Sequence, residues 1–194
     1  MTEPRPSVVI LAGPNGAGKS TVAPELLQGE LAIDDFVNAD VIALGLSAFN
    51  PEGAAVSAGR IMLTRVRELA SRRANFAFET TLSSRSFKPW IEKIRASGYE
   101  VHLFFLWLPS PELAVERVAD RVRSGGHDVP PETIRRRYRA GLHNLFRLYL
   151  PIVSSGAIYD CSGPRSVLVA ERLESSSASI YDQGRWTAVQ EGAV

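Results

Sequence analysis

The segment that constrains the fold most runs from Gly13 to Ser20 and reads Gly-Pro-Asn-Gly-Ala-Gly-Lys-Ser. It follows a nearly all-apolar run at residues 7–12 and precedes a helix-like stretch at residues 21–28. A buried strand, a glycine-rich loop with the Walker A pattern G-x-x-x-x-G-K-[ST], and a helix form the setting in which this motif binds nucleotide phosphates. Glycine permits the positive φ angles that turn successive N–H groups inward.

The residues of this loop have distinct expected roles toward a bound ATP or GTP. The inward amides and the N-terminus of the following helix form a site for anions. Lys19 is expected to contact the β- and γ-phosphates, and Ser20 to offer its hydroxyl to Mg²⁺, which prefers oxygen ligands. A glycine-rich turn that binds nothing would not explain why Lys-Ser-Thr opens the helix. The predicted nucleotide-binding residues are Gly13, Pro14, Asn15, Gly16, Ala17, Gly18, Lys19, Ser20 and Thr21.

Length and composition indicate one ordinary globular domain spanning residues 1–194. The chain is 45% hydrophobic and 22% charged, with a formal charge of +1, which argues against a bulk nucleic-acid or membrane-surface binder. Its single cysteine, Cys161, excludes an internal disulfide, and its apolar surroundings predict a core thiol. The first residues lack an apolar signal core, and the longest apolar run, 101–108, is too short to span a bilayer. We therefore expect a cytoplasmic protein with no membrane partner.

Apolar runs alternate with helix-like segments, which predicts an α/β fold, a P-loop NTPase three-layer sandwich. A mostly parallel sheet of about five strands is expected at residues 7–12, 36–40, 76–80, 99–108 and 157–161. Further helices are expected at residues 51–73, 88–97, 111–123 and 132–149. Ligands of such sheets bind beyond the C-terminal strand ends, so the glycine-rich loop, Asp40 and Glu79 should converge at one edge.

The pattern changes after Gly163. Residues 167–171 and 179–182 are short and β-like, and a serine-rich stretch separates them. They predict an antiparallel hairpin at the edge of the sheet, covering about residues 165–187, with Trp186 packed nearby.

Two acidic residues at predicted strand ends are candidates for chemistry. Asp40 is expected to accept the proton of an acceptor hydroxyl and to orient its oxygen; the alternative is an N-cap for a helix that starts at Val41. Glu79 is expected to hold Mg²⁺ through water or to hydrogen-bond the acceptor, because an unpaired carboxylate at a buried strand end is costly. Thr81 is expected to contact the acceptor, or alternatively to cap the segment that follows.

Arginines are dense on both sides of the Gly-Gly-His-Asp-Val-Pro segment at residues 125–130. A helix–hinge–helix unit of this kind, at about residues 117–145, resembles the lid of a nucleoside or metabolite kinase. The planar guanidinium suits the charge spread over a transferring phosphoryl group. We expect Arg121 and Arg137 to serve this role, although exposed surface positions are the competing interpretation for any one arginine. Arg136 is expected to face solvent, and His127 to belong to the hinge rather than to catalysis.

Five segments taken in order resemble the zeta-toxin-like family of P-loop kinases, and its short members most of all. They are the glycine-rich loop, Phe-Val-Asn-Ala-Asp-Val-Ile-Ala, Phe-Glu-Thr-Thr-Leu-Ser, Arg-Val-Arg-Ser-Gly-Gly-His-Asp-Val-Pro and Ile-Arg-Arg-Arg-Tyr, within residues 7–150. Zeta toxins phosphorylate the sugar of UDP-N-acetylglucosamine with ATP or GTP. The resemblance implies that Asp40 is the acceptor base, Glu79 and Thr81 contact the acceptor, and Lys19 clamps the phosphates. The chain is shorter than those toxins, and its Gly-Gly-His segment differs from their lid.

The function predicted from the sequence is therefore ATP-dependent phosphotransfer to a hydroxyl of a small molecule, with UDP-N-acetylglucosamine or a related sugar as the leading acceptor. A polynucleotide 5′-hydroxyl kinase is an alternative, but the near-neutral charge disfavours it. A GTPase switch is disfavoured because no Asn-Lys-x-Asp segment is present. Another alternative is a non-toxic nucleotide-binding protein of a toxin–antitoxin type pair, with an antitoxin as partner.

Overall fold

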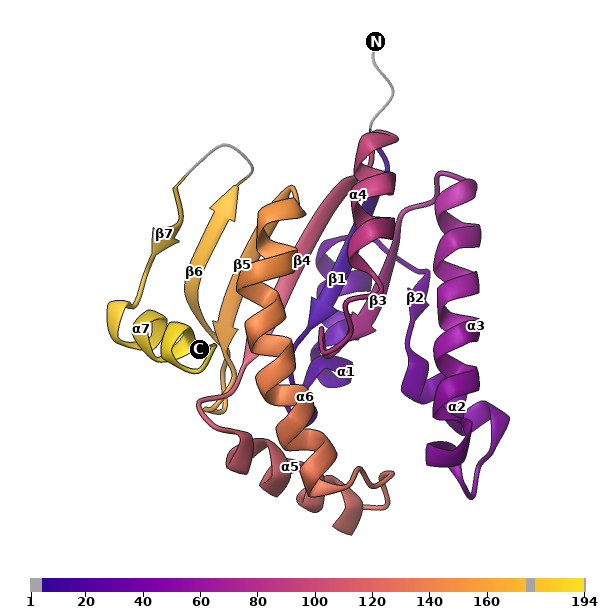
Figure 1. The fold of residues 1–194 in the computed structure, drawn as a ribbon, viewed down its shortest axis with the longest axis vertical. Coiled ribbons are helices and arrows are strands. Elements are labelled where there is room, and N and C mark those ends of the chain that lie inside the picture. Colours follow the sequence, from indigo (N-terminus) through magenta and orange to yellow (C-terminus); the bar gives the residue numbers. More distant parts are fainter. Residues whose placement is uncertain (1–4, 174–176, 194) are drawn as a thin grey trace.

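The computed structural model describes residues 5–173 and 177–193, which build one seven-stranded sheet flanked by helices (Figure 1). The strands are β1 (Ser7–Ala12), β2 (Phe36–Val37), β3 (Phe76–Thr80), β4 (Glu100–Trp107), β5 (Ser155–Asp160), β6 (Val167–Leu173) and β7 (Ser179–Ile180). The α-helices are α1 (Lys19–Ala23), α2 (Ala39–Leu46), α3 (Pro51–Ser71), α4 (Lys88–Ala96), α5 (Pro111–Arg123), α6 (Pro131–Asn144) and α7 (Gln183–Glu191). Two π-helical segments, Pro24–Glu30 and Leu145–Tyr149, and a 3-10 turn, Leu150–Ile152, extend α1 and α6.

The strand order is β2-β3-β1-β4-β5-β6-β7. The first five strands pair in parallel, β6 runs antiparallel to β5, and β7 runs antiparallel to β6. The prediction of a parallel sheet with an antiparallel C-terminal hairpin at its edge is confirmed. Residues 174–176, which the predicted hairpin includes, lie outside the described residues.

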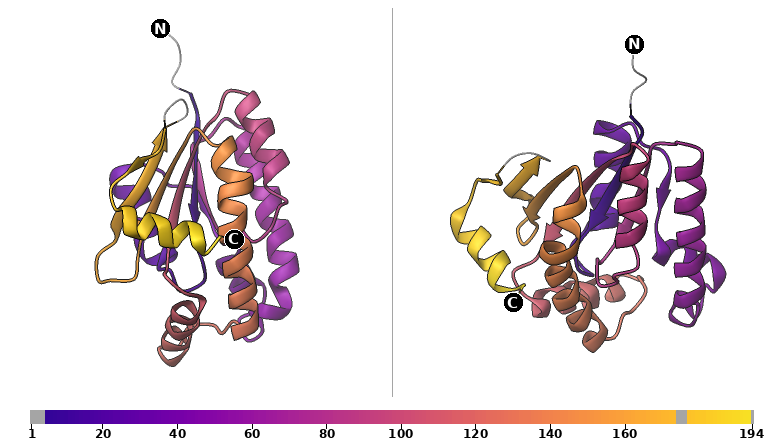
Figure 2. Two further views of the ribbon diagram at one scale, coloured as in Figure 1. Left: turned by 60° about the vertical axis from the view of Figure 1, so that its left-hand side comes forward. Right: turned by 45° about the horizontal axis from the view of Figure 1, so that its top comes forward.

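The two faces of the sheet are covered unequally. Helices α3, α4 and α6 lie against one face, whereas α1 and the π-helical segment Pro24–Glu30 lie behind β1 on the other (Figures 1 and 2). Strand β1 is central and almost entirely buried, as its all-apolar sequence requires. In β4, buried residues alternate with the half-buried Glu100, His102 and Phe104. The layer formed by α1 and Pro24–Glu30 therefore covers this strand less completely than the opposite layer does.

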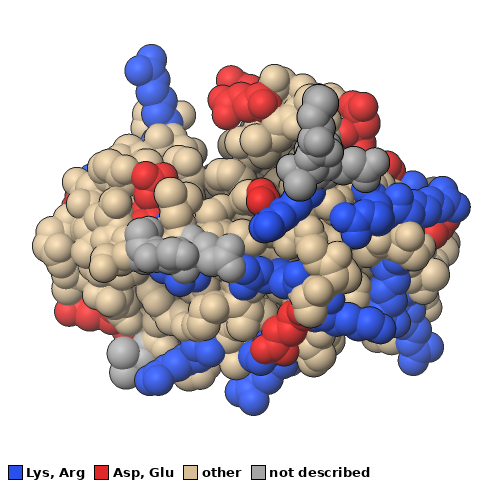
Figure 3. Space-filling view, turned by 90° about the horizontal axis from the view of Figure 1, so that it is seen from above, with Lys and Arg blue, Asp and Glu red and all other residues tan. Residues whose placement is uncertain are grey.

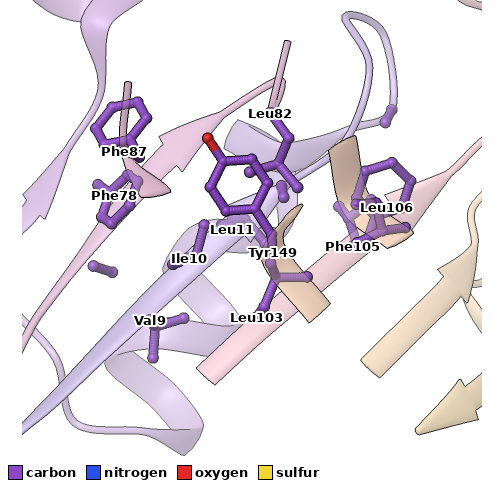
Figure 4. Packing of buried hydrophobic residues seen from close by; sticks show 14 of the residues in the cluster. Val9, Ile10, Leu11, Phe78, Leu82, Phe87, Leu103, Phe105, Leu106 and Tyr149 are labelled. Atoms are coloured by element: carbon purple, nitrogen blue, oxygen red, sulfur yellow. The ribbon is translucent and has the colours of Figure 1, made fainter. Parts of the chain in front are cut away.

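The core lies mainly between the sheet and the larger helical layer. Aromatic side chains of β3, of α4 and of Phe87 just before α4 pack together there, with the rings of Phe78 and Phe87 stacked at 5.0 Å between centroids. Figure 4 shows part of this core, including the ring of Tyr149 together with Leu11 of β1 and the loop residue Leu82. Tyr149 is fully buried, so the end of the α6 segment is anchored in the core.

Several predicted boundaries were wrong for local physical reasons. The strand predicted at 36–40 ends at Val37, because Asn38 caps α2, which starts at Ala39 rather than at Val41 as the alternative interpretation of Asp40 had it. The helix after the glycine-rich loop starts at Lys19 and becomes π-helical at Pro24, whose missing N–H removes one regular helical bond. The helix predicted at 132–149 is likewise π-helical from Leu145. The strand predicted at 157–161 spans Ser155–Asp160.

The C-terminal region contains a helix that the sequence interpretation missed. Asp182 caps α7 by accepting a hydrogen bond from the amide of Arg185. The predicted hairpin therefore extended too far, to residue 187, and the strand predicted at 179–182 was too long, since β7 ends at Ile180. Trp186 lies on this helix, and its ring packs edge-on against Phe146 at 5.6 Å. The helix thus joins the end of the chain to the α6 segment.

Figure 3 views the end of the molecule at which the parallel strands begin, where Lys and Arg side chains gather. Arg73 donates to the carbonyl of Ser97 at the end of α4, and Arg95 donates to the carbonyl of Ile152. Cations at helix C-termini are favourable because they satisfy carbonyl groups left without intrahelical partners. None of the described helices is long and apolar enough to cross a bilayer.

Tyr138 gives the fold a testable pH dependence. Its hydroxyl donates to the carbonyl of Leu108 at 2.6 Å, and burial raises the pKa of Tyr138 to about 12 from a usual value of 10. The neutral phenol therefore stabilises the fold fully below pH 10, and this contribution is lost as the pH rises toward 12. In urea denaturation between pH 9 and pH 12, Tyr138→Phe should lose stability less steeply than the wild type. An equally steep loss of stability with pH in both proteins would contradict the assignment of this pH dependence to Tyr138.

Candidate functional site

The glycine-rich loop has a backbone that only glycine permits at its key positions. Gly13, Gly16 and Gly18 have φ angles of 142°, 79° and 85°. A Cβ atom on Gly13 would lie 2.3 Å from the carbonyl oxygen of Leu106, so β4 leaves no room for a side chain there. The predicted cradle is therefore formed, with Gly18 leading directly into α1.

Lys19 is buried in this cradle. Its Nζ donates to the carbonyl oxygens of Gly13 and Pro14, at 2.9 and 2.8 Å, and lies 3.6 Å from Oε1 of Glu79. Burial lowers the pKa of the Lys19 ammonium, and the nearby carboxylates of Glu79 and Asp40 oppose this shift. A polyphosphate would give the ammonium charged acceptors, which bind more strongly than carbonyls.

Glu79 ends β3 at the centre of a hydrogen-bonded cluster. Its Oε2 accepts from Ser20 Oγ at 2.8 Å and from Asn38 Nδ2 at 2.7 Å. The hydroxyl and the carboxylate are hard oxygen ligands, and a protein Mg²⁺ site usually has one or two carboxylates and keeps several waters. Ser20 and Glu79 thus fit a Mg²⁺ site shared with nucleotide phosphates. The described residues contain no group of three or more His, Cys, Asp or Glu that could hold a metal by themselves.

Asn38 is a site residue that sequence reasoning missed. Its Oδ1 accepts from the amides of Asp40 and Val41, at 2.8 and 3.4 Å, so Asn38 caps α2. The alternative interpretation of Asp40 as the N-cap was wrong, because Asp40 already lies in the first turn of the helix. A helix-like pattern follows Asn38 directly, and asparagine is a preferred N-cap, so the signal was present in the sequence.

Asp40 faces the segment that joins α5 and α6. Its Oδ2 lies 3.6 Å from Nε2 of His127, and Arg121 Nη2 donates to the carbonyl of His127 at 3.0 Å. The side chain of Asp40 is 45% exposed. Helix α5 of the predicted lid therefore reaches the acidic residue through His127.

A cavity of about 360 Å³ lies between α3, α6 and the loop after β3. Lys19, Asp40, Glu79, Thr81 and Arg137, which the sequence had placed at the site, all line it. The other lining residues are Asn15, Asn38, Ala39, Val56, Gly59, Arg60, Met62, Leu63, Thr80, Ser83, Ser84, Ser86 and Phe87. Residues from five separate parts of the chain thus meet at one site.

The lid arginines differ in where they point. Arg121 does not line the 360 Å³ cavity, although its charge acts on Lys19 and lowers the pKa of that ammonium. Arg117 donates to the carbonyls of Cys161 and Ser162 and so ties α5 to the loop after β5. Arg136 is exposed, as predicted, and Cys161 is buried, as predicted.

Helix α6 fixes the loop that forms one wall of the cavity. Asn144 Nδ2 donates to the carbonyl of Leu82 at 2.8 Å, and a Cβ atom on Gly141 would lie 2.2 Å from the carbonyl oxygen of Thr81. The loop is turned sharply, since Leu82 has a φ of 55°. The amide of Leu82 donates a hydrogen bond to the hydroxyl of Thr80 rather than to that of Thr81.

Comparison with known proteins gives the family. The sequence profile of AAA_33, an AAA domain, matches residues 8–143, and the chain belongs to this family. An uncharacterized protein of Haemophilus influenzae is 28% identical over 130 residues, which cover 67% of this chain and 91% of that protein.

Solved structures agree on the fold. The crystal structure of AvrRxo1-ORF1 and -ORF2 with ATP matches with a TM-score of 0.76 at 16% identity; the match covers 99% of this chain but only 65% of that chain. A structure from the PezAT chromosomal toxin–antitoxin system of Streptococcus pneumoniae matches with a TM-score of 0.68 at 18% identity, over 99% of this chain and 86% of that one. The predicted three-layer α/β fold, with a mostly parallel sheet and an antiparallel hairpin at its edge, is confirmed.

Gly141→Ala tests the packing of α6 on the cavity wall. The added methyl group meets backbone, so α6 and the loop at residues 81–84 must separate, at a cost of about 1–3 kcal/mol. We expect a lower melting temperature, because this separation breaks the packing of α6 on the loop. The control is Gly45→Ala on α2, where a Cβ meets nothing within 4 Å. Equal melting temperatures for the two variants would contradict the packing argument.

Proposed function

We propose that the protein is an ATP-dependent phosphotransferase that moves the γ-phosphoryl group to a hydroxyl of a small molecule. One observation carries the proposal: the cradle lysine Lys19 and the two acidic residues Asp40 and Glu79 line the same 360 Å³ cavity. Phosphoryl transfer needs a phosphate clamp, charge neutralisation and a group that orients the nucleophile, and this cavity contains a candidate for each.

In this scheme the residues divide the work between nucleotide and acceptor. Lys19 and the loop amides bind the β- and γ-phosphates of ATP. Ser20 and Glu79 would hold Mg²⁺, which neutralises phosphate charge. Asp40 accepts the proton of the acceptor hydroxyl as its oxygen bonds to the γ-phosphorus and ADP leaves. Asn38 keeps Asp40 in place by capping α2 and positions Glu79 through its amide group.

The lid supplies positive charge from its two helices. Arg137 on α6 lines the cavity itself, whereas Arg121 on α5 lies behind His127 and near enough to act on Lys19. Closure of the lid would bring the Arg121 guanidinium toward the transferring group and exclude water. Thr81 and Glu79 line the acceptor side of the cavity. The leading acceptor is UDP-N-acetylglucosamine or a related sugar, and the reaction belongs in the cytoplasm, where ATP is supplied.

Asp40→Asn and Lys19→Ala separate the two halves of this scheme. Asp40→Asn should bind Mg²⁺–ATP normally but lose about 100-fold or more in turnover, because the base is removed. Lys19→Ala should lose most nucleotide affinity, because the buried ammonium faces the phosphates. Arg147→Ala, which removes an exposed side chain outside both hollows beside Asp40, is the control and should change neither. Calorimetry measures nucleotide affinity, and a coupled ADP assay measures turnover. Full turnover in the Asp40→Asn variant would exclude Asp40 as the base.

A second candidate, a nucleotide-binding member of a toxin–antitoxin type pair, is favoured by an apolar surface beside the cavity. Val41, Leu44, Phe49 and Val56 on α2, α3 and their connection are exposed, with Phe49 fully accessible at 104%. Val56 also lines the cavity, so a partner on this surface would cover its entrance. AvrRxo1-ORF1 was crystallised with a second protein, and the PezAT structure comes from a toxin–antitoxin system.

Phe49→Asp tests this second candidate. Coexpression with the product of a neighbouring gene should give a stable complex that Mg²⁺–ATP displaces. The variant should abolish that complex in size-exclusion chromatography while leaving nucleotide affinity unchanged, because Phe49 makes no contribution to the cradle. A complex that survives both the substitution and ATP would mean that the partner binds elsewhere.

A further inference from the structure

The segment that joins α5 and α6 holds His127 in a defined place. The amide of Gly126 donates to the carbonyl of Arg121 at 2.9 Å, and Arg121 Nη2 donates in turn to the carbonyl of His127 at 3.0 Å. A Cβ atom on Gly126 would lie 2.6 Å from Cγ of Arg121, so a side chain there would displace the arginine. Val129, two residues after the histidine, is buried. The segment is therefore a structured support for the histidine ring.

The ring of His127 lies between an arginine and the proposed base. Its Nε2 is 3.4 Å from Nη2 of Arg121 and 3.6 Å from Oδ2 of Asp40. A neutral imidazole nitrogen either carries a proton and donates, or has a free lone pair and accepts. The guanidinium has only donors and an ionised carboxylate only acceptors, so Nε2 can serve one of these neighbours at a time. The position of a single proton therefore decides which of the two groups the ring binds.

Asp40 differs from the other acidic residues around His127. A second hollow, of about 320 Å³, is lined by His127 and by the carboxylic residues Asp40, Glu52 and Asp128. Within the described parts of the chain, Asp40 is the one of these three whose carboxylate is paired with the ring. Asp40 also lines the 360 Å³ cavity together with Lys19. The pairing therefore connects the lid segment to the cavity in which phosphoryl transfer is proposed.

We propose that His127 is a positioning residue for the base: with a proton on Nε2, it donates to Asp40 and fixes the carboxylate that accepts the proton of the acceptor hydroxyl. The inference rests on the proposed function and adds a third group to it. A base oriented by a further group recurs in enzymes that activate a nucleophile. The proton of the hydroxyl still passes to Asp40, and His127 keeps its own. Because the side chain of Asp40 is 45% exposed, loss of this contact would leave the carboxylate free to rotate.

The first experiment locates the proton on the ring without any turnover. The chain has three histidines, so the ¹⁵N ring signals of His127 are identified by their absence in His127→Gln. At about pH 9, where histidine rings are ordinarily neutral, the protonated and unprotonated nitrogens are distinguished by NMR. With or without Mg²⁺ and the non-hydrolysable analogue AMP-PNP, the wild type should carry the proton mainly on Nε2. Asp40→Ala should move it toward Nδ1, because the donor Arg121 is then the remaining neighbour of Nε2.

Glu52→Gln is the matched control for this experiment. It removes the charge of another carboxylate that lines the same hollow, and it should leave the proton on Nε2. A wild-type ring with its proton mainly on Nδ1 would overturn the inference. The same holds if Asp40→Ala and Glu52→Gln give the same ring signals as the wild type.

The second experiment separates positioning from a purely structural role in the lid. Turnover of ATP is measured with water, N-acetylglucosamine and UDP-N-acetylglucosamine as acceptors. His127→Ala should lower kcat about tenfold to a hundredfold at an unchanged KM for ATP, since a misplaced base slows the chemical step. His127→Gln keeps an N–H donor and should recover most of this loss. In the Asp40→Ala background, His127→Ala should cost nothing further, because the group that it orients is already absent.

The outcomes distinguish this inference from the proposed function. Full turnover in His127→Ala, or an equal loss with and without Asp40, would overturn the positioning role and leave the kinase proposal intact. The absence of turnover with every acceptor, together with an Asp40-dependent proton on Nε2, would support the pairing and count against the kinase proposal.

Discussion

The rest of the site depends on the hydrogen bonds and the ion pair made by the carboxylate of Glu79. It joins three segments that are remote in sequence: the lysine and serine of the cradle, the asparagine that caps α2, and the end of β3. A buried carboxylate is stable only when it is paired and hydrogen-bonded, so this cluster fixes the relative positions of its partners. The cradle, the candidate metal ligands and Asp40 therefore share one geometry.

A second constraint comes from the close approach of α6 to the loop after β3. The missing side chain of Gly141 lets the helix backbone reach the carbonyl of Thr81, and Asn144 and Tyr149 hydrogen-bond the following carbonyls. The same helix carries Arg137 on the adjoining face. The position of α6 and the shape of the 360 Å³ cavity are thus linked.

The sequence predicted most of this arrangement where local patterns are strong. The glycine-rich loop, the parallel strands and the acidic residues at their C-terminal ends follow from motif and periodicity, because parallel strand ends meet at one edge. Predictions failed at Asp40, where strand and helix compete, and at Trp186, where a short helix has almost no amphipathic pattern. The sequence also did not distinguish the roles of the arginines near the 125–130 segment. In the structure, Arg117 and Arg121 donate to different backbone carbonyls, whereas Arg137 lines the cavity.

The sequence by itself determined the phosphate cradle and the five parallel strands with the longer helices between them, because both depend on near neighbours in the chain: glycines that allow positive φ, and apolar residues at regular spacing. Only the tertiary structure decided that Glu79 is satisfied by Ser20 and Asn38 and that Arg60 lines the same cavity as Lys19. These features are contacts between segments tens of residues apart, and no local pattern specifies which side chains meet once the sheet is assembled.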